Sequence, residues 1–161
     1  MPRLDRLWAD YHGLADLSRR TRLIKVVPLD GPPPERYLVT YRCKGLVWMQ
    51  GSPAPSISTF HRLNIYLHRD YPRRPPRLIW LSDIFHPNIL PPERNGGICI
   101  GSWSPAESLD RLVIRIGEMV QYKNYNVDLS DVLNKEAAVW AAANQGHLPV
   151  DARPLDEELG D

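Results

Sequence analysis

The residues of this sequence that can carry out covalent chemistry gather in one stretch. The segment "HPNILPPERNGGICIGSWSPA", from His86 to Ala106, holds a histidine, an asparagine and a cysteine among prolines and glycines. Prolines and glycines at this density exclude a regular helix or a central strand. The segment is therefore a loop, and its cysteine is a nucleophile, a metal ligand or only part of a turn.

The composition gives no support for a metal or for disulfides. Two cysteines, Cys43 and Cys99, are too few for a disulfide framework or a tetrahedral zinc site. The five histidines include no His-x-x-x-His pair. We therefore expect no metal site.

The length and charge are those of one globular domain. The chain has 161 residues, of which 43% are hydrophobic and 24% charged, with a formal net charge of +1. This balance gives no support for nucleic-acid binding, and no apolar run approaches the roughly 20 residues of a membrane span. The N-terminus lacks an apolar signal core, so we expect a cytoplasmic protein whose cysteines stay reduced.

Hydrophobic periodicity predicts a helix followed by a sheet. Apolar residues recur at helical spacing over residues 3–20. Four strand-like segments follow, over residues 22–29, 36–43, 57–68 and 77–81. Alternation puts Cys43 on the same side as neighbouring apolar residues, so it is expected in the core. Short, turn-rich links between consecutive strands favour an antiparallel meander.

Two helices are expected after the loop. The first covers residues 106–123, with Ser104 and Pro105 as the N-cap and first helical residue. The second covers residues 130–144, with Ser130 or Asp131 as N-cap. We divide the chain into a domain of residues 1–148 and an acidic, loose tail of residues 149–161. The fold class is α+β.

Five motifs in this order resemble those of ubiquitin-conjugating enzymes. They are "YPRRPP" from Tyr71, "HPN" from His86, "GGIC" from Gly96, "WSPA" from Trp103 and "VLNKEAA" from Val132. The resemblance implies the UBC-like fold of that family: an N-terminal helix, a four-stranded antiparallel meander, a long active-site loop and two C-terminal helices. Because the chain turns acidic after Asn144, the C-terminal helices of eukaryotic members are expected to be shortened or absent.

The resemblance also implies an activity. Such enzymes accept a ubiquitin-like protein from an activating enzyme as a cysteine thioester, and pass it to an amine, usually a lysine of a protein substrate. The expected partners are therefore a ubiquitin-like protein, an activating enzyme and a protein substrate. No cofactor takes part, since ATP is used by the activating enzyme.

Cys99 is the expected nucleophile, because a thiol attacks thioesters readily and leaves well from them. The alternative is a buried structural cysteine, against which Gly96 and Gly97 argue, since they let backbone approach a reacting group. Asn88 is either a donor to the oxyanion or a brace of the loop. His86 is expected to be structural rather than a general base, and Pro87 stiffens the same turn.

Asp131 matches a family position where an acid orients and deprotonates the incoming lysine. Its alternative role is a helix N-cap. Leu133 is expected to shield the site from water. The residues expected to contact partners are Arg3, Arg6, Arg73, Trp103, Pro105 and Ala106. Arg73 replaces the apolar aromatic that ligase-binding members usually carry, so docking of a conventional ligase is doubtful.

Three further features narrow the resemblance. The Asn88–Cys99 gap is longer than in typical eukaryotic members, the Cys99–Trp103 gap is shorter, and arginine outnumbers lysine. These features look most like the bacterial relatives in operons that encode a ubiquitin-like protein, the Bil-type antiphage systems. Two other functions compete: a non-catalytic UBC-like binding module, which would lack a cysteine here, and a Cys–His acyl hydrolase with His86 as base.

Overall fold

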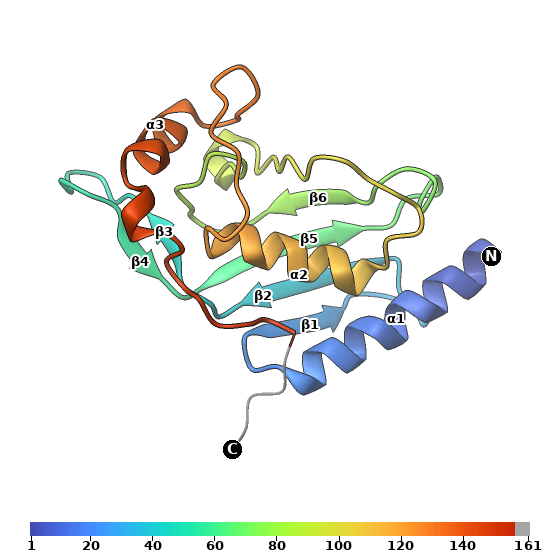
Figure 1. Ribbon diagram of the computed structural model, residues 1–161. Helices are drawn as coiled ribbons and strands as arrows, with labels where there is room; N and C mark the ends of the chain where they lie inside the picture. Colours follow the sequence, from blue (N-terminus) through green and yellow to red (C-terminus); the bar gives the residue numbers. More distant parts are fainter. Residues whose placement is uncertain (157–161) are drawn as a thin grey trace.

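The computed structural model describes residues 1–156 and has a four-stranded antiparallel sheet at its centre (Figure 1). Its strands follow one another in the order β1-β2-β5-β6. They are β1 (Ile24–Pro28), β2 (Arg36–Tyr41), β5 (His61–Tyr66) and β6 (Arg77–Trp80). All three neighbouring pairs are antiparallel, which confirms the predicted meander.

Two helices cover one face of this sheet (Figure 1). The first, α1 (Arg3–Arg20), has the predicted bounds, and the second is α2 (Leu109–Val120). Alternate residues of β2 and β5 point toward these helices and are buried, because successive side chains of a strand face opposite sides. Cys43 lies in the same core, as predicted.

A hairpin that the sequence pattern did not predict is inserted between β2 and β5. It consists of β3 (Gly45–Val47) and β4 (Ser56–Ser58). The prediction of one long strand over residues 57–68 is therefore wrong. The chain bends at two exposed residues, and the buried imidazole of His61 makes a 2.8 Å hydrogen bond to the carbonyl of Ser58 across this bend.

The helices after the loop begin later than predicted. Neither Ser104 nor Pro105 caps α2; instead the carboxylate of Asp10, from α1, accepts a hydrogen bond of 3.1 Å from the amide of Leu109. The last helix, α3 (Lys135–Ala143), is capped by Asn134, whose side chain accepts from the amide of Ala137 at 3.0 Å.

The prediction that Ser130 or Asp131 is an N-cap is therefore wrong. Both residues lie in an irregular segment before α3. Asn134 satisfies one free amide of the first turn, that of Ala137, in their place. A short 3-10 turn, η2 (Gln145–His147), follows α3, and another, η1 (Pro92–Arg94), lies in the long loop.

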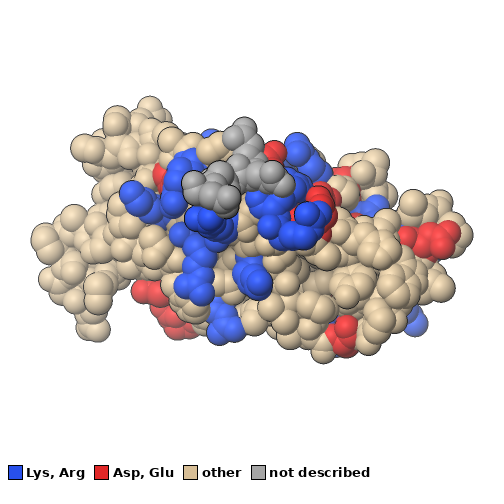
Figure 2. Space-filling model, turned by 90° about the horizontal axis from the view of Figure 1, so that it is seen from below, with Lys and Arg blue, Asp and Glu red and all other residues tan. Residues whose placement is uncertain are grey.

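Residues 149–156, expected as the start of a loose tail, pack against the sheet-and-helix body. Leu155 is buried beside Gly117, and the buried carboxylate of Asp151 accepts from the amide of Lys44 at 2.8 Å. At the end of the segment, Arg20 donates to the carbonyl of Asp156. Figure 2 shows that Lys and Arg side chains gather on one face of the molecule. Residues 157–161 lie outside the described residues.

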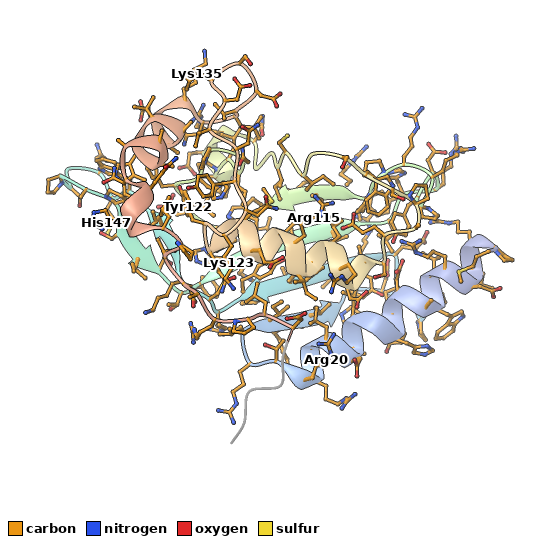
Figure 3. All side chains as sticks on the ribbon, viewed as in Figure 1. Arg20, Arg115, Tyr122, Lys123, Lys135 and His147 are labelled. Atoms are coloured by element: carbon orange, nitrogen blue, oxygen red, sulfur yellow. The ribbon has the colours of Figure 1, made fainter. Side chains whose placement is uncertain are left out.

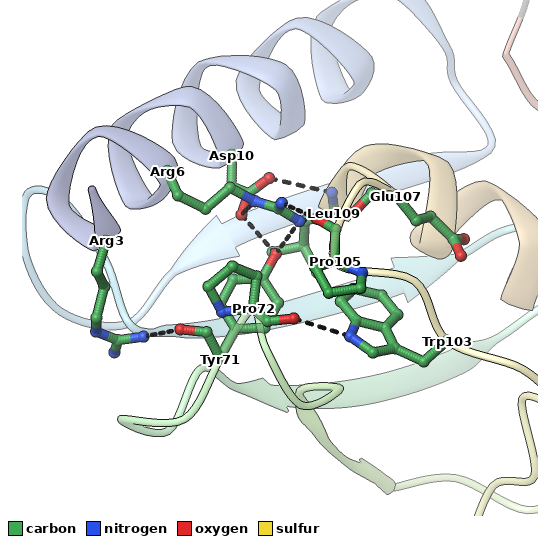
Figure 4. A network of polar contacts seen from close by, with 9 residues as sticks. All are labelled: Arg3, Arg6, Asp10, Tyr71, Pro72, Trp103, Pro105, Glu107 and Leu109. Atoms are coloured by element: carbon green, nitrogen blue, oxygen red, sulfur yellow. Dashed lines mark hydrogen bonds and ion pairs between the residues drawn. The ribbon is translucent and has the colours of Figure 1, made fainter. Parts of the chain in front are cut away.

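A buried polar cluster joins α1, the loop before β6 and the start of α2 (Figure 4). Asp10 lies 2.8 Å from the guanidinium of Arg6 and accepts 2.6 Å from the hydroxyl of Tyr71. Arg6 also donates to that hydroxyl at 2.8 Å and to the carbonyl of Glu107 at 2.6 Å. Because the carboxylate of Asp10 also accepts from the amide of Leu109, it holds together α1, the loop at Tyr71 and the start of α2.

We predict that Asp10→Ala lowers the free energy of unfolding by about 3–5 kcal/mol, because it leaves a buried cation unpaired and the start of α2 uncapped. The matched control is Asp16→Ala on the same helix. Asp16 is 48% exposed and pairs with Arg19 and Arg20 on the surface, so its loss should cost about 0–1 kcal/mol. Urea denaturation measures both values, and equal losses would contradict a structural role for the cluster.

Candidate active site

The long loop folds back so that its two ends lie together. Isolated bridges pair His86 with Ile89 and Ile89 with Ile98. The amide of Cys99 then donates to the carbonyl of Asn88 at 2.9 Å. The residues between Asn88 and Cys99 therefore close into a loop that places these two residues side by side.

A cavity of about 160 Å³ opens at this point. It brings together three of the predicted catalytic residues, Cys99, Asn88 and Asp131, from separate parts of the chain. The rest of its wall is formed by Ile100, Gly101, Met119, Asn124, Tyr125 and Asn126.

The two cysteines differ in their access to solvent. Cys99 is exposed in the loop, whereas Cys43 is buried in the core. Burial raises the pKa of the Cys43 thiol to about 12, so Cys43 carries no thiolate at neutral pH. Cys99 is therefore the thiol that another protein can reach, and the structural-cysteine alternative fits Cys43 instead.

Asn88 makes the contacts of a loop brace. Its side-chain oxygen accepts from the amide of Asn126 at 2.9 Å, and its side-chain nitrogen donates to the carbonyl of the same residue at 3.2 Å. This pair ties the loop to the segment after α2. A side-chain amide carries two N–H protons, so one remains for an oxyanion in the cavity, and that second role stays a prediction.

His86 has no free nitrogen to act as a base. Its Nε2 donates to the carbonyl of Met119 at 2.7 Å, and its Nδ1 accepts from the amide of Asn88 at 3.0 Å. Complete burial lowers the pKa of His86 to about 3, so the imidazole is neutral. A Cys–His pair is therefore not formed, and the hydrolase alternative lacks its base.

The glycines before Cys99 serve the packing of the loop. Gly96 has a φ of +67°, and a Cβ there would lie 2.6 Å from the carbonyl oxygen of Trp80 in β6. The carbonyl of Gly96 accepts from the amide of Trp80 at 2.9 Å. The expected close approach is therefore to β6 and not to a reacting group, which corrects the reason for Gly96. The amide of Gly97 donates to the side-chain oxygen of Asn95 at 2.8 Å.

Asp131 and Leu133 lie on the segment that crosses the loop. Asp131 is exposed on the cavity wall and accepts from the side-chain nitrogen of Asn126 at 3.2 Å. The amide of Leu133 donates to the carbonyl of Pro87 at 2.9 Å. The side chain of Leu133 lies beside Gly97, outside the cavity wall, so it covers the flank of the loop and not the cavity itself.

Arg115 of α2 holds the chain just after Cys99, a contact that sequence reasoning missed. Its guanidinium pairs with both carboxylate oxygens of Glu107, at 3.1 and 3.0 Å. It also donates to the carbonyl of Ile100 and, at 3.4 Å, to that of Ser102. Figure 3 shows Arg115 on α2. No sequence signal marked it, because Glu107 precedes α2 while Arg115 lies in its middle, so the pair lacks the three- or four-residue spacing of helical ion pairs.

The expected partner-binding residues fall into two groups. Arg6 contacts Asp10 and Tyr71 within the chain, and Arg3 donates to the carbonyl of Tyr71 at 2.5 Å and pairs with Glu35 at 2.7 Å. These arginines hold α1 to the body, and the placement of Arg6 in the buried cluster speaks against the predicted surface role.

The second group stays on the surface. Trp103 is half-buried and donates to the carbonyl of Pro72 at 2.9 Å, whereas Pro105 and Ala106 are exposed. The side chain of Arg73 is 80% exposed and pairs with Asp70 at 3.1 Å. The cation of Arg73 therefore stands next to Pro72, which Trp103 binds, and the partner contacts of this surface stay a prediction.

Comparison with known proteins agrees with this geometry. The family model described as ubiquitin-conjugating enzyme matches residues 48–147, which is more than half of the chain. The chain therefore belongs to the ubiquitin-conjugating enzyme family, and its UBC fold confirms the predicted fold class. Members of this family are ubiquitin-like protein transferases that work through a thioester.

Individual relatives match over part of the chain. An 88-residue stretch is 32% identical to the NEDD8-conjugating enzyme UBC12 of Yarrowia lipolytica, covering 52% of this chain and 45% of that protein. Another 88-residue match is 34% identical to ubiquitin-conjugating enzyme E2 13 of Saccharomyces cerevisiae, covering 52% and 54%. The chain thus spans about half the length of these curated relatives.

A solved structure shows the same fold over most of the chain. The E2 domain of a Toxoplasma gondii ubiquitin-conjugating enzyme superposes with a TM-score of 0.59 at 21% identity, covering 88% of each chain. Within the described residues 1–156, no helix is long and apolar enough to cross a membrane. The same residues contain no group of three His, Cys, Asp or Glu side chains placed to hold a metal ion.

We predict that His86 makes stability depend on pH. Burial lowers its pKa from 6.5 to about 3 in the folded chain, so between these values the unfolded chain binds one more proton. The free energy of unfolding should therefore fall as the pH falls below about 6.5, by up to about 1.4 kcal/mol per pH unit. Urea denaturation between about pH 7 and pH 5 should show a shallower slope for His86→Gln.

The comparison between variants is needed because burial lowers the pKa of His61 as well. His61 is present in both proteins, so the difference in slope isolates His86. The NMR signal of the His86 ring in the unchanged protein supplies a measurement that no substitution disturbs. A His86 signal that titrates near its ordinary pKa would contradict the buried, neutral imidazole.

We also predict that Arg115→Ala loosens the chain around Cys99. Hydrogen bonds to a charged group contribute about 1.5–3 kcal/mol, so amide hydrogen exchange over residues 99–104 should speed up by about tenfold or more. Arg111→Ala is the control, because Arg111 loses the same charge from α2 but lies 66% exposed, 4.0 Å from Asp156. Equal exchange in both variants would remove Arg115 from the group that positions Cys99.

Proposed function

We propose that this chain accepts a ubiquitin-like protein as a thioester on Cys99 and transfers it to the amine of a lysine on a protein substrate. The observation that carries the proposal is the exposed Cys99 thiol at a hollow whose wall includes Asn88 and Asp131. Family membership supports the reaction class, and the arrangement of these three side chains supports their roles.

The first step exchanges one thioester for another. The thiolate of Cys99 attacks the carbonyl carbon of the ubiquitin-like protein held on the activating enzyme, and the sulfur of that enzyme leaves as a thiolate. The exposure of Cys99 lets two folded proteins meet at the sulfur. ATP is consumed by the activating enzyme, and we propose no cofactor or metal in either step.

The second step is aminolysis. The lysine nitrogen attacks the thioester carbonyl, negative charge gathers on the carbonyl oxygen, and the Cys99 thiolate leaves. The second N–H of Asn88 donates to that oxygen, while the first N–H stays hydrogen-bonded to the carbonyl of Asn126. The exposed carboxylate of Asp131 attracts the lysine ammonium and accepts one of its protons, which frees the lone pair that attacks. The nitrogen loses a second proton to water or to the leaving thiolate, and a neutral amide forms.

The proposal also covers the partners of the chain and the pathway in which it acts. The partners are a ubiquitin-like protein, an activating enzyme and a protein substrate; a conventional ligase is doubtful because the side chain of Arg73 is 80% exposed beside the surface it would use. We propose that the pathway is a bacterial, cytoplasmic antiphage system. Adjacent genes for a ubiquitin-like protein and an activating enzyme would support this setting, and their absence from the source genome would contradict it.

We predict that Cys99 carries the thioester. Incubation with the activating enzyme, ATP and the ubiquitin-like protein should give a reductant-sensitive adduct on a gel, and Cys99→Ala should abolish it. Cys43→Ala is the matched control, because that thiol is buried and protonated. Cys99→Ser should give a reductant-resistant ester.

An adduct lost in Cys43→Ala and kept in Cys99→Ala would overturn the assignment. Release of free ubiquitin-like protein without any adduct would favour a hydrolase.

We predict that Asp131→Asn folds normally, forms the thioester and discharges it slowly to free lysine at neutral pH. Asparagine keeps an oxygen for the contact with Asn126 but lacks the charge that attracts and deprotonates the amine. The defect should shrink as the pH rises toward the lysine pKa of about 10.4. Asp128→Asn, an exposed neighbour outside the cavity wall, is the control. A normal discharge rate in Asp131→Asn at neutral pH would remove Asp131 from the catalytic residues.

A further inference from the structure

A second, larger hollow of about 750 Å³ lies between the β3–β4 hairpin, the long loop and α3. We call it the α3 groove. In Figure 1, α3 and the hairpin both lie at the end of the sheet opposite the N-terminus. The groove is lined by Trp48, Asp83, Ile84, Phe85, Pro91, Glu93, Asn134, Lys135, Glu136, Val139 and Trp140.

Aromatic rings form one wall of the α3 groove. The centre of the Phe85 ring lies 5.0 Å from the centre of the Trp48 ring and 6.1 Å from that of Trp140, and both contacts are edge to face. Trp48 remains 39% exposed and Val139 57% exposed. Large apolar side chains that face solvent around a hollow suit the apolar side chains of another chain.

The charged residues of the groove are mostly acidic. Three carboxylates, from Asp83, Glu93 and Glu136, stand against one ammonium, that of Lys135. Within residues 1–156, neither Glu93 nor Glu136 forms an ion pair. Exposed carboxylates beside tryptophan rings favour a cationic side chain, which gains from both charge and the faces of the rings.

The α3 groove continues toward Cys99. Asn134, Lys135 and Glu136 also line a neighbouring hollow, whose other wall is formed by Arg94 and Leu133. Leu133 lies beside Gly97, two residues before Cys99. The same segment carries Asp131, on the side from which the lysine is expected to arrive. The groove is therefore placed to hold a protein whose lysine reaches the thioester.

We propose that the α3 groove binds an extended segment of the acceptor protein in which basic and apolar side chains alternate near the target lysine. This inference rests on the proposed function and adds the chemical class of its acceptor. The apolar side chains pack against Trp48 and Val139, and the basic side chains meet the carboxylates of Glu93 and Glu136.

Binding is tested on the protein alone, without any conjugation partner. The probes are two short fluorescein-labelled peptides, each with a central lysine between valine and leucine residues; one carries flanking arginines and the other flanking glutamates. Fluorescence anisotropy should show binding of the arginine peptide only, weakening as salt is raised. Glu136→Lys and Trp48→Ala should each raise its Kd by about tenfold.

Asp5→Lys is the matched control for charge, since it makes the same change on the exposed start of α1, far from the groove in sequence and fold. Its Kd should equal that of the unchanged protein. Equal binding of the two peptides, or an equal effect of Asp5→Lys and Glu136→Lys, would overturn the proposal. Melting temperatures confirm that each variant is folded.

A second arm separates this inference from the proposed function. Thioester on Cys99 should discharge faster to the arginine peptide than to the glutamate peptide, and Glu136→Lys should remove this preference while leaving discharge to free lysine unchanged. If no thioester forms, the proposed function fails and the binding result stands by itself. If thioester forms and discharges without preference between the peptides, the function stands and the groove inference fails.

Discussion

Asn88 is the residue on which the candidate active site depends. Its amide donates to His86, its carbonyl accepts from Cys99, and its side chain pairs with both backbone groups of Asn126. Asn88 thus joins the start of the loop, the cysteine and the segment after α2. Because the residue is buried, each of these polar groups would be costly to leave without a partner, and the three segments are held together as a result.

The residues around the cavity are of two kinds: buried residues that fix the loop through hydrogen bonds, and exposed residues whose side chains are accessible. His86 is buried, neutral and bonded through both nitrogens, so it orders the turn without taking part in proton transfer. Cys99 and Asp131 are exposed on the same cavity. The difference follows from burial: it keeps the imidazole of His86 neutral, whereas the side chains of Cys99 and Asp131 remain accessible to solvent.

The sheet was predictable because one of its faces is buried. Alternation at Tyr37, Val39 and Tyr41 marked the inner face correctly, and helical spacing gave α1 its bounds. Contacts between distant segments were not readable in this way. The cap of α2 comes from Asp10, which lies 99 residues earlier, and the packing of Leu155 depends on its meeting Gly117.

For the site, motif resemblance pointed to Cys99, Asn88 and Asp131, which the structure places on one cavity. Residue type alone gave Asp131 a capping role that Asn134 fills, and it did not indicate that Gly96 packs against β6. A motif records which residues recur together. It does not record which of several polar side chains satisfies a given backbone group, because that choice depends on distances set by the whole fold.

In the proposed function Cys99 meets two folded proteins in turn, and such a nucleophile cannot be oriented by enclosure. A buried thiol such as Cys43 is well ordered, but its raised pKa and lack of access exclude it from transfer. At Cys99 the order comes from the backbone instead: Asn88 binds its amide, and Arg115 binds the carbonyl of the next residue. The backbone on both sides of the Cys99 side chain is thus held by hydrogen bonds while the side chain itself stays exposed, and this combines the alignment and the access that the proposed transfer needs.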